Sequence, residues 1–135
     1  MENKAIDFFN QGYSCSEAIL KTAAAKGLFP EDLIKMGTAF SGGMSSGCLC
    51  GAITGAQLVI SYNLGRNDIA GNSVECKKTA RKFIEKFKAR HKYTCCRILS
   101  KKYEFNTPER RQNCANLVNS SSEILNEIIK QMVKV

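Results

Sequence analysis

The stretch FSGGMSSGCLCGAITGAQLVISYNL, residues 40–64, decides the fold of this chain. A turn rich in glycine and serine runs directly into an apolar segment, and Cys48 and Cys50 lie at the junction. Glycine recurs at every fourth position of the stretch, as Gly47, Gly51 and Gly55. On a helix this spacing places the glycines on one face, where another backbone can approach closely. We therefore expect a buried central helix.

Length and composition bound the class of protein. A chain of 135 residues can form a stable hydrophobic core without disulfides or structural metal ions, so we expect one domain over residues 1–135. The apolar segment 49–62 is interrupted by polar residues and is too short and too rich in glycine for a membrane span. Residues 2–12 contain no pattern typical of a secretory leader. These features favour a cytoplasmic protein.

Apolar residues recur at helical spacing along the rest of the chain. The expected helices span residues 3–12, 14–26, 30–40, 45–65, 72–92 and 107–132, with a shorter one at 95–101. Ser14 and Glu17 form a capping-box pattern, and Thr107 followed by Pro108 is typical of a helix start. No strong period-two run occurs. The sequence predicts an all-α bundle of about six helices around the glycine-rich central helix.

The seven cysteines are unusual for a chain of this length without an export signal. An odd number cannot pair completely within one molecule, and structural disulfides are uncommon under reducing conditions. This favours metal ligation or redox chemistry. The alternative is structural, because a free cysteine also serves as a small buried hydrophobe.

Four of the cysteines lie near expected helix starts: Cys15, Cys50, Cys96 and Cys114. Ser45 or Ser46 is expected to cap the helix that contains Cys50. At a helix start the free amides and the helix dipole lower the pKa of a thiol and favour the thiolate, which is both nucleophile and metal ligand. We therefore predict a shared catalytic or metal-binding site of these four thiolates, with Cys50 at its centre.

We expect the other three cysteines and two glycines to lie around Cys50. Cys15 and Cys114 would be its partners from neighbouring helices, and Cys96 a ligand or resolving thiol. Gly51 and Gly55 would let a sulfur or a bound group approach the backbone. Zinc or an iron–sulfur cluster accepts four sulfurs, and the same thiols could instead form reversible disulfides without any cofactor. The spacing does not decide between these, and no C-x-x-C motif is present.

Four segments together resemble a known family: YSCSEAIL from residue 13, GGMSSGCLCGAITGA from residue 42, CRIL from residue 96 and CANLV from residue 114. They are similar to the small proteins named after the cysteine signature C_GCAxxG_C_C, to which redox activity is ascribed. The central box of that signature corresponds to residues 50–55, CGAITG, although here the glycine follows the cysteine. By position, the four signature cysteines match Cys15, Cys50, Cys96 and Cys114. The resemblance implies redox chemistry and specifies no reaction; Cys48, Cys76 and Cys95 fall outside it.

A second hypothesis uses the net charge of +8. Basic residues gather in one segment: Lys77, Lys78, Arg81, Lys82, Lys86, Lys88, Arg90 and Lys92. The chain could be a non-enzymatic helical protein that binds nucleic acid or an acidic partner, its cysteines being structural. Glu75, Glu85 and the apolar stripe of Phe83 and Phe87 instead indicate a solvated helix face, which disfavours nucleic acid. The redox hypothesis implies an electron-donor or electron-acceptor protein as partner and leaves room for a homo-oligomer.

Overall fold

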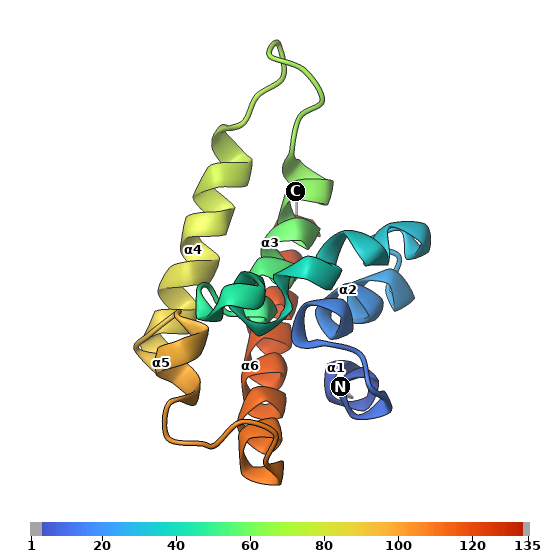
Figure 1. Ribbon diagram of the computed structural model, residues 1–135. Coiled ribbons are helices and arrows are strands. Elements are labelled where there is room, and N and C mark those ends of the chain that lie inside the picture. The colour runs from blue at the N-terminus through green and yellow to red at the C-terminus, as the bar shows by residue number, and fades with distance from the viewer. Residues whose placement is uncertain (1–3, 134–135) are drawn as a thin grey trace.

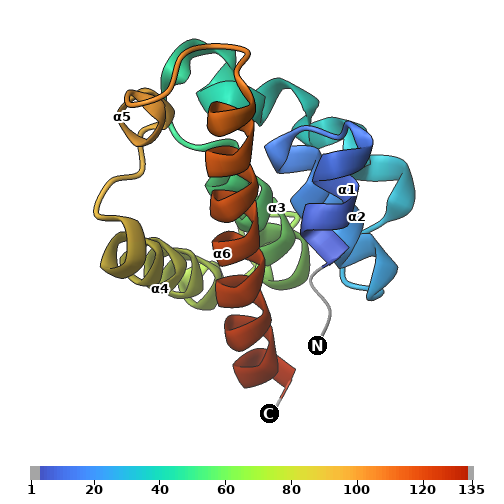
Figure 2. The same cartoon turned by 90° about the horizontal axis from the view of Figure 1, so that it is seen from below.

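The computed structural model describes residues 4–133, and these form an all-α fold. The helices are α1 (Lys4–Gln11), α2 (Cys15–Ala25), α3 (Gly51–Leu64), α4 (Val74–His91), α5 (Cys96–Ser100) and α6 (Pro108–Val133). A 3-10 helix, η1 (Glu31–Phe40), and a π-type turn, η2 (Gly43–Gly47), connect α2 to α3. Figures 1 and 2 show α3 and α6 in the middle of the molecule, with α4 on one side and α1 and α2 on the other. The predicted helical bundle is confirmed.

Helix α3 forms the centre of the core. Five of its apolar side chains are almost completely buried, namely Ala52, Ile53, Ala56, Val59 and Ile60. It packs against α2, α4 and α6. A Cβ atom added at Gly55 would lie 2.9 Å from the carbonyl oxygen of Ser16 and 3.1 Å from Cβ of Ile19. The predicted close approach of a second backbone to this helix is therefore confirmed, and the second backbone is that of α2.

Local signals in the sequence set two of the helix starts. The Ser14 Oγ atom accepts a hydrogen bond from the Glu17 amide at 3.3 Å, and the Glu17 carboxylate accepts one from the Ser14 amide at 3.0 Å. This reciprocal capping box satisfies amides that have no partner within the helix. At the start of α6, Thr107 Oγ1 accepts from the Arg110 amide at 3.2 Å. Cys15 thereby becomes the first residue of α2.

The start of α3 differs from the prediction. The helix begins at Gly51 with Cys50 in the N-cap position, so Ser45 and Ser46 do not cap it. The reason is a run of left-handed backbone: φ is positive at Gly42, Gly43, Met44, Ser45 and Gly47. A right-handed helix cannot pass through such residues, and each non-glycine member costs about 1–2 kcal/mol. Gly47 is consequently outside α3 and does not share a face with the two later glycines.

Tertiary hydrogen bonds hold this left-handed turn in place. Ser45 Oγ donates to the carbonyl oxygen of Ala39 at 2.9 Å, and the Arg97 guanidinium donates to that of Ser46 at 3.1 Å. The turn is thus fastened to η1 on one side and to α5 on the other. It forms the end of the core at which the cysteines gather.

The contact at Gly55 generates a test of the fold. Gly55→Ala should destabilise the protein by about 1–3 kcal/mol, since the added methyl group meets backbone and core atoms that cannot move freely. Urea unfolding of the reduced protein measures this loss. Ser61→Ala, on the exposed side of the same helix, is the control and should change stability little. A fully stable Gly55→Ala variant would contradict the packing of α2 on α3.

Candidate functional site

A short backbone pairing brings two distant cysteines together. Residues 48–50 run antiparallel to residues 94–96, with Leu49 opposite Cys95. The amide of Cys50 donates to the Thr94 carbonyl oxygen at 2.9 Å, and the amide of Cys96 donates to the Cys48 carbonyl oxygen at 2.5 Å. These two hydrogen bonds fix the start of α5 beside the start of α3. Cys50 and Cys96 therefore occupy one end of the bundle.

The four predicted site cysteines meet there. Cys15, Cys50, Cys96 and Cys114 all line one cavity of about 230 Å³. The remainder of its wall includes hydroxyl and apolar side chains: Ser14, Ser41, Ser100, Phe9, Phe105 and Leu117. The cysteines come from α2, from the N-cap of α3, from α5 and from α6. The four cysteine side chains therefore converge on one cavity, as we expected from the sequence.

The other three cysteines lie apart from this cavity. Cys48 is exposed, and Cys76 is half-buried on α4, within 4.0 Å of the Ser61 hydroxyl. The Cys95 thiol donates to the carbonyl oxygen of Gly47 at 3.2 Å, on the other side of the short backbone pairing. None of the three lines the cavity.

Gly51 and Gly55, the two glycines of the CGAITG segment, have different surroundings. A Cβ atom added at Gly51 would lie 2.4 Å from Cys15 Sγ and 3.0 Å from the carbonyl oxygen of Phe40. Only glycine at this position leaves room for the Cys15 sulfur against the start of α3. Gly55, predicted to serve the same site, is not part of the cavity wall and packs against α2 instead.

Burial dominates the acid–base behaviour of the cavity thiols. Desolvation, with a smaller contribution from negative charge on Cys15, raises the pKa of the Cys50 thiol to about 12, although the nearby amide of Ala52 opposes the rise. Desolvation likewise raises the pKa of Cys15 and of Cys114. The expectation that the helix starts would lower these pKa values was therefore wrong for these three thiols. At Cys15 and Cys50 nearby amides favour the thiolate, but the loss of water outweighs them.

More nearby amides favour the thiolate at Cys15 than at Cys50 or Cys114. The amides of Gly42 and Ser16, and its own amide, each act to lower the pKa of its thiol against the larger effect of burial. The Gly42 amide is presented by the left-handed turn. A thiolate on Cys96 would raise the pKa of Cys15, Cys50 and Cys114, so the four thiols are electrostatically coupled. Once one of them ionises, ionisation of the others becomes harder.

The structure does not show a preformed metal site in the part of the chain that it describes. Within residues 4–133, no group of three or more Cys, His, Asp or Glu side chains is placed so that it could hold a metal ion. Ligation of zinc or an iron–sulfur cluster by Cys15, Cys50, Cys96 and Cys114 stays a prediction.

Two further residues of the cavity escaped the sequence analysis. Arg110 and Phe105 both line it, and the Arg110 guanidinium lies 5.4 Å from the centre of the Phe105 ring. One signal could have found the arginine, because it precedes Cys114 by four positions and so shares its face of α6. Nothing comparable in the sequence indicates Phe105, which belongs to the loop between α5 and α6.

The basic segment forms the exposed side of α4. Phe83 and Phe87 are fully buried, as the apolar stripe predicts. Some of the cations are already paired with α6: Lys86 with Glu127 at 3.5 Å and Arg90 with Glu123 at 2.7 Å. This pairing accounts for part of the charge without an external partner. Binding of nucleic acid or an acidic partner stays a prediction.

Comparison with known proteins places the chain in a family. Residues 13–128 match the model of the family described as "Putative redox-active protein (C_GCAxxG_C_C)", so the chain belongs to that family. No curated protein and no solved structure matches it. The four cysteines that we assigned to the signature by their position all line the cavity. In the part of the chain that the structure covers, no helix has the length and apolar character needed to cross a membrane.

The raised pKa of Cys50 predicts how stability depends on pH. The thiol has a pKa near 9.0 when unfolded and about 12 when folded, so above pH 9 the unfolded state loses its proton first. Stability is thus fully present below the unfolded value and declines as pH rises towards the folded one. We expect reduced protein to lose about 1 kcal/mol from this group between about pH 8 and about pH 9.5.

Urea unfolding at a series of pH values measures this decline. Cys50→Ala should make the decline shallower, because the thiol with the largest pKa shift is gone. Cys76→Ala removes a thiol outside the cavity and should leave the slope unchanged. Equal slopes in all three proteins would show that burial of Cys50 does not control its ionisation.

Proposed function

We propose that this protein is a thiol–disulfide redox protein in which the cavity cysteines cycle between thiols and disulfides. The observation that carries the proposal is the convergence of Cys15, Cys50, Cys96 and Cys114 on one cavity, from four separate parts of the chain. Membership of a redox-active family supports it independently. Disulfide formation also removes two ionisable groups from a buried place where charge is disfavoured.

Cys15 and Cys50 are the pair that the geometry favours for the exchange. Gly51 follows Cys50 directly and leaves room for the Cys15 sulfur against the start of α3. Among charged neighbours, Cys15 has the largest effect on the pKa of Cys50. Cys15 also has the amide of Gly42 to stabilise its thiolate, so it is the better nucleophile of the two. Cys96 and Cys114 then form a second pair in the same cavity.

The reaction proceeds by two displacements. The Cys15 thiolate attacks one sulfur of an acceptor disulfide R–S–S–R, a mixed disulfide forms, and one R–S⁻ leaves and takes up a proton. Cys50 loses its proton and attacks the Cys15 sulfur, which breaks the mixed disulfide and releases the second R–S⁻. Two protein thiols and R–S–S–R thus become one protein disulfide and two R–SH. A dithiol donor returns the protein to its reduced form by the reverse steps.

Thiol counting tests the proposed function. Mild oxidation of the reduced protein should lower the number of free thiols from seven by two or four, and a dithiol reductant should restore all seven. Cys15→Ser and Cys50→Ser should each abolish the change assigned to the first pair, because neither cysteine can form it alone. Cys76→Ser is the matched control and should behave as the parent protein does. Metal analysis after anaerobic purification accompanies the experiment.

Two results would contradict the proposal. One is a protein whose seven thiols show no reversible change under any mild oxidant. The other is a reversible change that persists in both serine variants and disappears with Cys76→Ser. Stoichiometric zinc or iron in the anaerobic protein would favour the metal-ligation alternative instead.

A further inference from the structure

The thiol cavity adjoins a second, more open hollow. This hollow has a volume of about 500 Å³ and is lined by residues of α1, of the loop before α6 and of the first turns of α6. The two spaces share four wall residues: Phe9, Phe105, Arg110 and Cys114. The hollow therefore lies directly beside the thiol cavity.

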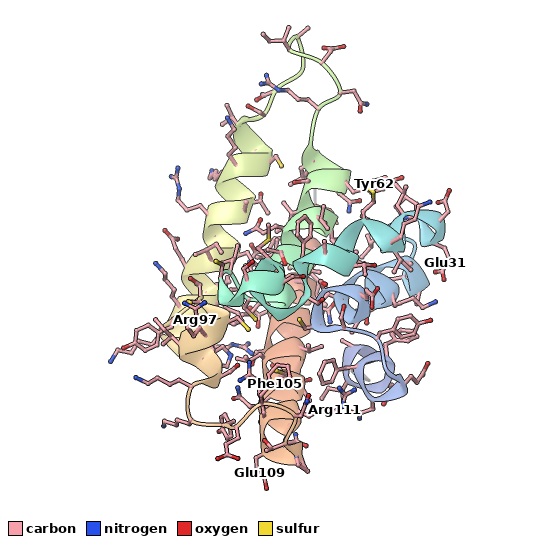
Figure 3. All side chains as sticks on the ribbon, viewed as in Figure 1. Glu31, Tyr62, Arg97, Phe105, Glu109 and Arg111 are labelled. Atoms are coloured by element: carbon pink, nitrogen blue, oxygen red, sulfur yellow. The ribbon has the colours of Figure 1, made fainter. Side chains whose placement is uncertain are left out.

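The hollow is cationic. Arg110 and Arg111 both line it, and neither takes part in any ion pair among residues 4–133. Figure 3 shows Arg111 and Phe105 beside the same end of α6, with Glu109 beyond them at the helix end. Both arginines act on Cys114, where their charge opposes the rise in its pKa that burial causes. The positive potential of the hollow therefore reaches the thiol cavity.

Arg110 and Arg111 differ in the contacts that their guanidinium groups make within the protein. The Arg111 guanidinium donates to the carbonyl oxygen of Phe9 and lies 4.3 Å from the centre of the Phe9 ring, so it ties α6 to α1. Arg110 contacts the Phe105 ring, which is itself 75% exposed. Arg110 also belongs to the walls of both spaces, which Arg111 does not. Arg110 is thus the cation available to a ligand that reaches the thiols.

We propose that the acceptor is a small organic disulfide that carries a carboxylate, with Arg110 pairing with the carboxylate while the disulfide bond lies in the thiol cavity. This inference rests on the proposed function. The charge selects the ligand class, since a guanidinium pairs with a carboxylate and repels an ammonium group. The rings of Phe9 and Phe105 offer apolar contact to the short carbon chain between the charged group and the sulfur.

The chemistry remains that of the proposed exchange. Two cavity thiols and one carboxylate-bearing disulfide give one protein disulfide and two carboxylate-bearing thiols, so electrons pass from the protein to the small molecule. The carboxylate itself does not react. Arg110 is a positioning residue, and it should affect the rate for acidic disulfides and not the capacity of the thiols to be oxidised.

The test compares three disulfides of similar size: dithiodipropionic acid, hydroxyethyl disulfide and cystamine, which are acidic, neutral and basic. Each oxidises full-length reduced protein carrying Cys48→Ser, a change that removes the exposed thiol outside the cavity. Loss of free thiols is followed over time by intact mass. Arg110→Gln should slow the acidic disulfide by about fivefold, the size of a partly exposed ion pair, leave the neutral one unchanged and speed the basic one. Arg110→Lys should restore most of the rate.

The matched control is Arg81→Gln, which makes the same charge change on the exposed side of α4, away from both spaces. It should alter none of the three rates appreciably, and circular dichroism confirms that the variants fold. The inference is overturned if Arg110→Gln slows all three disulfides alike, or if Arg81→Gln slows the acidic one as much. In both cases reversible oxidation, and with it the proposed function, survives. A parent protein that none of the three disulfides oxidises, although another mild oxidant changes its thiols reversibly, would overturn the inference and leave the proposed function standing.

Discussion

The sulfur of Cys15 lies against the first residue of α3, and this contact depends on the absence of a side chain at Gly51. A Cβ atom there would lie 2.4 Å from the sulfur. The same helix approaches α2 again one turn later, at Gly55. These two contacts bring the start of α2 to the start of α3, and so bring Cys15 to Cys50. The backbone pairing positions Cys96 beside this pair, and α6 contributes Cys114 to the cavity wall.

Two opposing effects act on the thiols of Cys15 and Cys50. The starts of helices provide amides that stabilise a thiolate, while burial removes the water that would stabilise it better. At Cys50 burial is the stronger effect and raises the pKa to about 12. At Cys15 the left-handed turn adds the amide of Gly42, although burial still prevails. A buried thiol that resists ionisation reacts slowly at neutral pH.

The parts of the structure that depend on neighbours in sequence could be predicted. The capping box of Ser14 and Glu17 and the cap at Thr107 act over three residues, so the helix starts follow from local chemistry. The four signature cysteines could be named from their order along the chain. The left-handed turn before α3 could not, because tertiary hydrogen bonds hold Ser45 in a conformation that its sequence disfavours. The pKa of Cys50 and the place of Phe105 likewise depend on burial and on distant segments.

The central claim is that the signature cysteines react with one another because they share a cavity. Peptide mass mapping of the mildly oxidised, full-length protein tests it most directly, since it identifies each disulfide by its two residues. The account predicts bonds confined to Cys15, Cys50, Cys96 and Cys114, with Cys15 joined to Cys50. Intramolecular bonds that join these cysteines mainly to the three outside the cavity would contradict it.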